Sequence, residues 1–125
     1  MSRNRVLIVD DEPDLLAALA RSIKAAGYEV VTARDGLVAI SEVETVAPDL
    51  ILCDVMMPGL NGFQTTRKLK QNVLSAMIPV LLMSAKADPA DHFWAQEVGA
   101  IVLLKKPLDT RELVQKIKDT LAKAQ

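Results

Sequence analysis

Cysteine is almost absent from this sequence: Cys53 is the only one among 125 residues. A single cysteine excludes an intrachain disulfide framework of the kind that stabilises small secreted domains. Cys53 also stands within an apolar run, which favours a small buried hydrophobe over a reactive thiol. We therefore expect a protein of a reducing compartment, with the cytoplasm as its location.

The sequence also lacks an excess of charge of one sign, with 15 basic against 16 acidic residues. This balance gives no electrostatic footprint for direct nucleic-acid binding. Long hydrophobic runs are missing as well, because charged residues interrupt every apolar stretch well short of the about 20 residues that a membrane-spanning helix needs. A signal peptide is not expected either. The length fits one domain, residues 1–125.

Short apolar strands are present, and they alternate five times with amphipathic helical segments. This alternation predicts an α/β domain with a parallel sheet. The second strand is less uniformly apolar than the others, which favours an edge position. We therefore expect a doubly wound, five-stranded parallel sheet of order 2-1-3-4-5 with helices on both faces, the flavodoxin-like order. The expected strands are Arg5–Val9, Glu29–Ala33, Leu50–Cys53, Pro79–Met83 and Ile101–Leu104.

Polar residues stand where four of these strands end. They are Asp10, Asp11, Asp54, Ser84 and Lys106. The carboxyl ends of parallel strands lie along one edge of the sheet, and ligands bind outside that edge where the strand order reverses. The strand order makes the first and third strands neighbours, so the three carboxylates are expected to meet there.

Three converging carboxylates repel one another unless a cation is present. Oxygen ligands without a nearby His or Cys select a hard cation, and Mg²⁺ is favoured because the site leaves positions for water and phosphate oxygens. Lys106 supplies a point charge for an anion, and a neighbouring carboxylate would keep it protonated. Lys105 should point to the opposite face of its strand. A cis peptide bond before Pro107 would be one way to aim Lys106.

Three other residues are given ordinary structural roles. Ser84 lacks the sequence motif of a nucleophile and is better suited to donate a hydrogen bond to an anion. His92 has no second metal-ligating residue nearby and is expected to be a solvated or half-buried helix residue. Trp94 is expected in the core, on a helical apolar stripe with Ala90, Phe93 and Val98.

The acid pair, the solitary Asp, the hydroxyl and the Lys-Pro pair, in this order, resemble the receiver domain of two-component response regulators, the CheY-like family. The resemblance covers essentially the whole chain. It implies that Asp54 is the phosphoacceptor and that Mg²⁺ is held by Asp11, Asp54 and the backbone carbonyl of Met56. Asp10 would act largely through water.

The same resemblance implies that Ser84 closes on the phosphoryl group and that Lys106 pairs with it. The donor would be a sensor histidine kinase or a histidine phosphotransfer protein. The output partner would meet the face formed by the fourth helix, fifth strand and fifth helix. The chain would promote only its own phosphotransfer and autodephosphorylation, and it would not be an enzyme acting on other substrates.

Two rival activities fit the residues poorly. Aspartyl-phosphate phosphatases of the haloacid dehalogenase type need a second Asp two residues after the first, where this chain has Met56. Nucleotide or flavin binding needs a phosphate loop after the first strand, where Asp10, Asp11 and Glu12 would repel a phosphate. The stronger alternative is a receiver-like interaction module that works without phosphorylation.

Leu103 supports that alternative, because it stands where the family commonly has a Tyr or Phe that acts as a rotameric switch. With Ile101 and Val102 it is expected to offer a permanently apolar strand to a partner. A second, weaker resemblance is to the CheY-like regulators of type IV pilus twitching systems. It depends on the segment from Gly62 to Pro79, on Trp94 and on the pair Gly99-Ala100.

Overall fold

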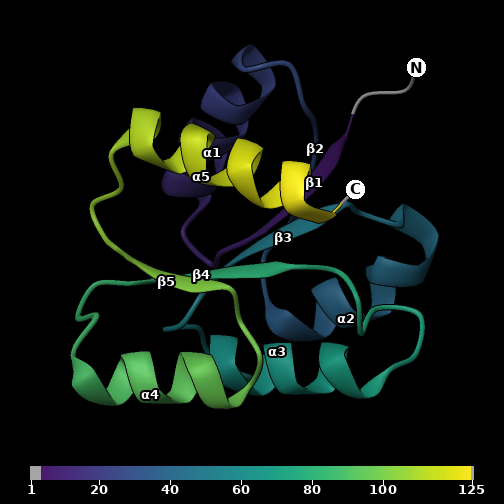
Figure 1. Cartoon of the computed structure of the whole chain (residues 1–125), viewed down its shortest axis with the longest axis vertical. Helices are drawn as coiled ribbons and strands as arrows, with labels where there is room; N and C mark the ends of the chain where they lie inside the picture. Colours follow the sequence, from purple (N-terminus) through teal and green to yellow (C-terminus); the bar gives the residue numbers. More distant parts are fainter. Residues whose placement is uncertain (1–3, 125) are drawn as a thin grey trace.

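The computed structural model describes residues 4–124, so residues 1–3 and 125 of the predicted domain lie outside the described residues. All five strands form one parallel sheet in the order β2-β1-β3-β4-β5, as the sequence predicted. Figure 1 shows the sheet crossing the middle of the molecule. The strands are β1 (Arg5–Val9), β2 (Glu29–Ala33), β3 (Leu50–Asp54), β4 (Val80–Ser84) and β5 (Val102–Lys105).

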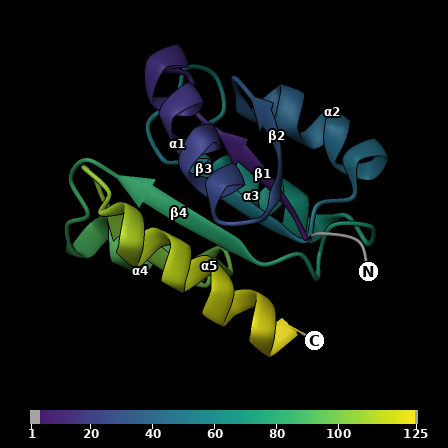
Figure 2. The same ribbon diagram turned by 90° about the horizontal axis from the view of Figure 1, so that it is seen from above.

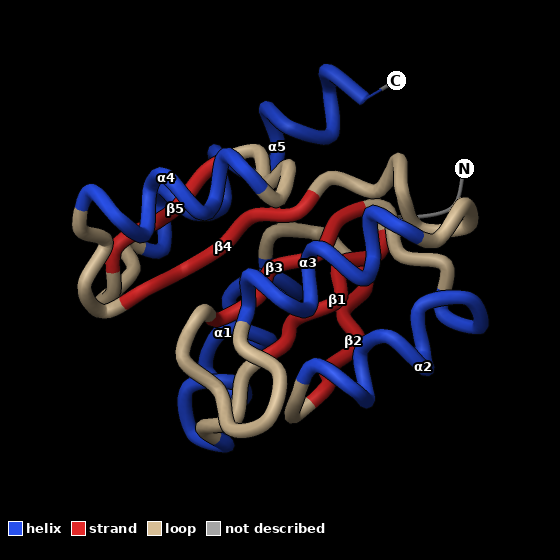
Figure 3. Tube along the Cα trace, turned by 90° about the horizontal axis from the view of Figure 1, so that it is seen from below, coloured by secondary structure: helices blue, strands red, loops and turns tan. Residues whose placement is uncertain are grey.

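Five helices cover the two faces of this sheet. In Figure 1, α1 and α5 lie above it, and α2, α3 and α4 lie below it. Figure 2 shows the first pair from above and Figure 3 shows the other three from below. The helices are α1 (Pro13–Ala25), α2 (Gly36–Val46), α3 (Gly62–Gln71), α4 (Pro89–Glu97) and α5 (Thr110–Ala124).

The core has two halves, one on each face of the sheet. Leu19 and Ile23 of α1 pack with Leu113 and Ile117 of α5 on one face. Leu69 of α3 belongs to the other half, where α2 and α4 also contribute. Every residue of β3 and β4 is buried, whereas β2 is half exposed, which agrees with central and edge positions. Burying each large apolar side chain contributes about 1.5–3 kcal/mol.

Side-chain caps fix where the helices near the carboxyl edge begin. Asn61 and Gln64 form a capping box at the start of α3, with bonds of 2.8 and 2.9 Å. The Asp88 side chain accepts from the backbone N–H of Asp91 at the start of α4. Such caps satisfy N–H groups that the first helical turn leaves unpaired. They therefore stabilise the first turns of α3 and α4, the helices that follow β3 and β4.

Three predicted strands differ from the structure by one residue at one or both ends, because β3 ends at Asp54, β4 is Val80–Ser84 and β5 is Val102–Lys105. Asp54 and Ser84 are the last residues of β3 and β4, because each still pairs with a neighbouring strand. Ile101 precedes β5 instead of opening it. Across residues 4–124, no helix combines the length and the apolar character that crossing a bilayer requires.

The structure corrects two expectations about side-chain direction. Trp94 is 46% exposed and Phe93 is 55% exposed, so neither belongs to the core. The buried residues of that segment are Ala95 and Val98, because these two pack into the half of the core that lies on this face of the sheet. Leu103 is 6% exposed and packs in the half of the core beneath α4. The prediction that it offers an apolar surface to a partner is therefore wrong.

Candidate functional site

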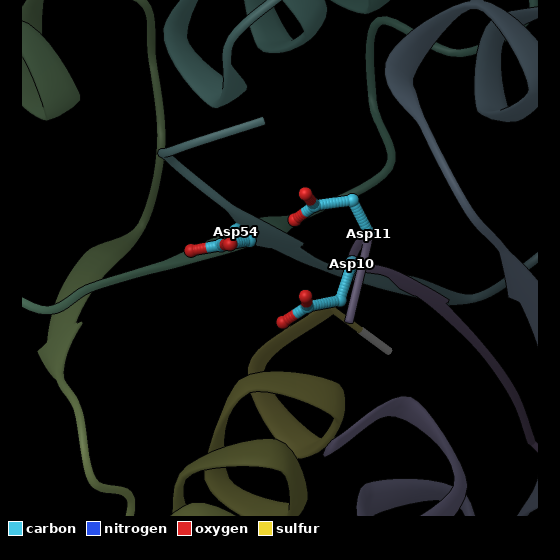
Figure 4. Close-up of side chains that lie close together, drawn as sticks. All are labelled: Asp10, Asp11 and Asp54. Atoms are coloured by element: carbon cyan, nitrogen blue, oxygen red, sulfur yellow. The ribbon is translucent and has the colours of Figure 1, made fainter. Parts of the chain in front are cut away.

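Three carboxylates meet where β1 and β3 end. Val9 pairs with Cys53, so Asp10 and Asp54 follow at the same level of neighbouring strands. Oxygens of Asp10, Asp11 and Asp54 all lie within 4.8 Å of one another. Figure 4 shows the three side chains gathered at this edge. Asp10 and Asp54 are buried, whereas Asp11 is exposed, so the cluster opens to solvent on the Asp11 side.

Lys106 reaches this cluster from the end of β5. Its Nζ lies 3.2 Å from Asp10 Oδ2 and 3.2 Å from Asp54 Oδ1. Lys105 is exposed, as the alternation of side chains predicted. The Lys106–Pro107 peptide bond is cis, as suggested from the sequence. We call the three aspartates and Lys106 the acid pocket.

Burial and like charge shift the pKa values in the acid pocket. Burial, with help from Asp10, raises the pKa of Asp54 to about 6, although Lys106 and the Met56 backbone act in the opposite direction. Burial alone would lower the pKa of Lys106, but Asp54 and Asp10 outweigh it, and the net shift is upward. The lysine therefore stays protonated while Asp54 is harder to ionise than an ordinary carboxyl.

Backbone groups hold the acid pocket in place. The Asp10 carboxylate accepts from the backbone N–H of Glu12 at 2.9 Å, which fixes the turn after β1. A Cβ atom on Gly62 would lie 2.8 Å from the Cα of Val55 and closer still to the Asp54 carbonyl. Only glycine lets α3 begin so near the end of β3. The position of Asp54 thus depends on this close approach.

The donor set fits a hard divalent cation. Carboxylate oxygens are the ligands that Mg²⁺ prefers. The negative charge of the three carboxylates exceeds the positive charge of the single lysine. The predicted contribution of the Met56 carbonyl stays a prediction, because the structure records only its exposed side chain and its backbone bond to Asp54. Sequence reasoning thus located the three carboxylates that the structure brings together.

Ser84 belongs to a separate arrangement at the end of β4. Its buried hydroxyl donates to Asp91 Oδ2 of α4 at 2.8 Å and accepts from the backbone N–H groups of Lys86 and Ala87. Ser84 therefore holds the loop between β4 and α4 as well as the helix itself. We call Ser84 and Asp91 the latch. Asp91 was missed from the sequence, because it lies seven positions after Ser84 and beyond an irregular loop.

The remaining candidates behave as ordinary structural residues. Cys53 is fully buried, and burial together with Asp54 and Asp10 raises the pKa of its thiol, so it is unreactive. His92 is exposed on α4, as expected. Neither residue adds chemistry to the acid pocket.

The model of the response regulator receiver domain family matches residues 6–118. Protein PilH of Pseudomonas aeruginosa is 36% identical over 94% of this chain and 98% of its own length, and it supports the second resemblance, to the type IV pilus regulators. The alkaline phosphatase synthesis transcriptional regulatory protein PhoP of Bacillus subtilis is 36% identical over 97% of the chain. The chain spans 50% of that regulator's length.

Solved structures agree with the fold over nearly the whole chain. A putative response regulator from Chloroflexus aurantiacus superposes with a TM-score of 0.92 and 33% identity, covering 97% of this chain and 99% of its own. The chemotaxis protein CheY4 of Vibrio cholerae gives a TM-score of 0.90 and 28% identity, covering 94% and 98%. With the family match and the strand order, these likenesses establish that the chain belongs to the family of response regulator receiver domains.

Proposed function

We propose that this domain receives a phosphoryl group on Asp54 from a phosphohistidine of a sensor histidine kinase or a histidine phosphotransfer protein. The observation that carries the proposal is the Asp54 carboxylate, held 3.2 Å from the Lys106 ammonium and beside two further aspartates. Phosphoryl transfer needs positioning and neutralisation of charge more than it needs covalent help from other groups. The acid pocket supplies both.

In the proposed reaction an Asp54 carboxylate oxygen attacks phosphorus. A P–O bond forms as the P–N bond to the donor imidazole breaks, and the imidazole leaves as the neutral base after taking up a proton. With its pKa near 6, Asp54 is mostly ionised at neutral pH and can act as the nucleophile. The Lys106 ammonium neutralises charge on the transferred group. Hydrolysis of the acyl phosphate would return the domain to its starting state.

Asp11 and Asp54 would hold Mg²⁺ directly, with the Met56 carbonyl as the predicted further ligand, and Asp10 would act largely through water. The bound ion would neutralise phosphoryl oxygens as the reaction proceeds. The exposed position of Asp11 leaves room for a donor phosphate on that side. The chain would turn over no other substrate, so its activity is confined to its own phosphorylation and dephosphorylation.

The conformational response to phosphorylation of Asp54 would involve the latch, Ser84 and Asp91. A phosphoryl group on Asp54 offers three acceptor oxygens, and they would compete with Asp91 for the Ser84 hydroxyl. Loss of the bond to Asp91 would free the start of α4, so the population of α4 positions would shift. An output partner at the face of α4, β5 and α5 would read this shift. The buried free cysteine fits the proposed cytoplasmic location.

Intact-mass measurement tests the proposal directly. Incubation with acetyl phosphate and Mg²⁺ should add one phosphoryl group, and either EDTA or Asp54→Asn should abolish the adduct. Asp49→Asn serves as the matched control, because Asp49 lies at the opposite end of β3. An adduct of equal yield in Asp54→Asn would refute the assignment.

The alternative, an interaction module independent of phosphorylation, is favoured by one residue only. Leu103 stands where the family pattern has an aromatic switch. It is buried in the core, however, and it is not one of the residues that form the acid pocket. Absence of any adduct in the wild-type protein, together with unchanged partner binding, would favour this alternative.

A further inference from the structure

A groove lies between α3 and α4, and no residue of the acid pocket lines it. Its cavity has a volume of about 630 Å³, within the range of ligand-binding clefts. Both helices lie on the same face of the sheet, as Figure 3 shows. We call this cavity the α3–α4 groove. The lining residues are Leu60, Asn61, Phe63, Gln64, Arg67, Lys68, Gln71, Trp94 and Val98.

The charge of the groove has one sign. Arg67 and Lys68 are both exposed, and within the described chain no carboxylate lines the cavity. Side-chain amides of three further lining residues can pair with carboxylates or with backbone groups. On a chain whose net charge is −1, this local excess of positive charge is not a consequence of overall composition. It complements an acidic partner.

The apolar part of the groove carries an aromatic side chain that the core does not use. Trp94 is 46% exposed and meets Phe93 edge to face, with ring centroids 5.2 Å apart. The T-shaped contact favours one orientation of the indole ring. Tryptophan and arginine are the residues that most often dominate binding energy at protein interfaces. Here one of each lines the same cavity.

The shape of the groove favours a segment of protein over a compact ligand. The lining residues of α3 run from Phe63 to Gln71, about 12 Å at the rise of an α-helix. A length of about two helical turns matches a short amphipathic helix laid between two helices.

We propose that the α3–α4 groove binds an acidic amphipathic helix of a partner protein. Apolar side chains of that helix would pack on Trp94 and Phe63, and its carboxylates would pair with Arg67 and Lys68. The groove includes no residue of the acid pocket and lies on the α3 side of α4. The proposal therefore goes beyond phosphoacceptance and does not depend on it.

Two synthetic helical peptides of about 16 residues test this, both free of tryptophan. One has leucines at positions i, i+3, i+4 and i+7 with glutamates on the flanks, and the other has lysines in place of the glutamates. Trp94 is the only tryptophan of the protein, so any change in tryptophan fluorescence comes from a residue that lines the groove. The acidic peptide should bind saturably and at least about tenfold more tightly than the basic one.

Variants decide where the peptide binds. Arg67→Glu combined with Lys68→Glu should weaken the acidic peptide by about tenfold or more and strengthen the basic one. Lys118→Glu combined with Lys123→Glu is the matched control, because both residues are exposed on α5 and the change in net charge is the same. This control should leave the affinity within about twofold. Trp94→Ala, followed by calorimetry, should also weaken binding, and circular dichroism checks folding.

Three results would overturn the proposal. They are the absence of saturable binding by the acidic peptide, equal affinity for both peptides, and equal losses in the α3 and α5 charge reversals. Binding of a nucleoside triphosphate in the groove without binding of the acidic peptide would likewise replace the proposed helix by a compact ligand. Each readout uses unphosphorylated protein, so failure here is distinguishable from failure of phosphoacceptance.

Discussion

The acid pocket and the latch lie at the same edge of the sheet but differ in how their charges are satisfied. In the pocket a single ammonium faces two buried carboxylates and a third nearby. In the latch one carboxylate accepts from one hydroxyl, at 2.8 Å. The pocket thus has uncompensated negative charge that a cation can relieve, whereas the latch is already satisfied. The first suits chemistry and the second suits the holding of a conformation.

The latch nevertheless holds a strained backbone. Ala87 adopts a φ of +48°, in the left-handed region that non-glycine residues disfavour by about 1 kcal/mol. Its N–H group donates to Ser84 Oγ. Withdrawal of the Ser84 hydroxyl would therefore remove a support of this conformation along with the bond to Asp91. We therefore expect the charges of the acid pocket to affect mainly the stability of the fold, and the latch to affect mainly the position of α4.

The largest effect is expected beneath α4, where Leu103 packs. Leu103→Ala should lower the free energy of unfolding by about 3 kcal/mol, because truncation leaves a cavity in the core. Ile101→Ala, at a position that is 55% exposed, should change it by less than about 0.5 kcal/mol. Urea denaturation measures both. Similar small losses in the two variants would mean that Leu103 faces solvent.

The next effect concerns the pocket. Lys106→Met should lower the metal-free stability at pH 7 by about 2–3 kcal/mol, because it leaves buried carboxylates without their partner. Lys105→Met is the control, since this neighbouring lysine is exposed and should contribute little. Mg²⁺ should restore part of the stability lost in Lys106→Met. Equal destabilisation by both substitutions would contradict the ion pairs of the pocket.

Asp54→Asn should act in the opposite direction and stabilise the metal-free protein by about 2 kcal/mol above pH 6. The raised pKa means that the folded state disfavours the ionised carboxyl. The wild-type protein keeps its full stability below the unfolded pKa near about 4. It loses stability as the pH rises through about 6.

Thermal denaturation from pH 4 to pH 8 tests this prediction, because the stability advantage of Asp54→Asn should grow from pH 4 to about 6 and stay constant above that pH. The exposed Asp11 gives the comparison, and Asp11→Asn should stabilise less. A pH-independent difference between wild type and Asp54→Asn would argue against the raised pKa.

The smallest effect is expected from the latch. Asp91→Ala removes the competitor for the Ser84 hydroxyl, so the affinity for beryllofluoride with Mg²⁺, a phosphoryl mimic, should rise about fivefold, or about 1 kcal/mol. His92→Ala, an exposed neighbour on α4, should leave it unchanged. Trp94 fluorescence follows both titrations. Weaker mimic binding in Asp91→Ala would show that the latch supports the active conformation instead.

The sequence predicted the sheet and the cluster because both depend on strong local signals. An apolar strand that ends in a carboxylate needs no tertiary information, and parallel strands gather their carboxyl ends by geometry. The side of α4 that faces the sheet could not be predicted, because the apolar residues Phe93, Trp94, Ala95 and Val98 are spread widely around the helix. In the structure Ala95 and Val98 are the two that pack into the core.

The latch was missed for a different reason. In the sequence Asp91 is an acidic residue in the first turn of a predicted helix, and a favourable interaction with the helix dipole is enough to explain its presence there. Its bond to Ser84 requires the loop to turn back on itself, which the left-handed Ala87 permits and no sequence rule indicates. The prediction for Leu103 failed for a similar reason. A four-residue strand next to an irregular segment is too short for the alternation of side chains to show which residues face the core.

Identification of the phosphorylated residue tests the central claim most directly. Borohydride reduces an aspartyl phosphate to homoserine, so treatment of the acetyl phosphate adduct followed by peptide mass mapping marks the acceptor. The account predicts conversion at Asp54 alone, with none at the neighbouring Asp10 and Asp11 of the same pocket. Conversion at either neighbour, or at no aspartate while the adduct is present, would contradict it.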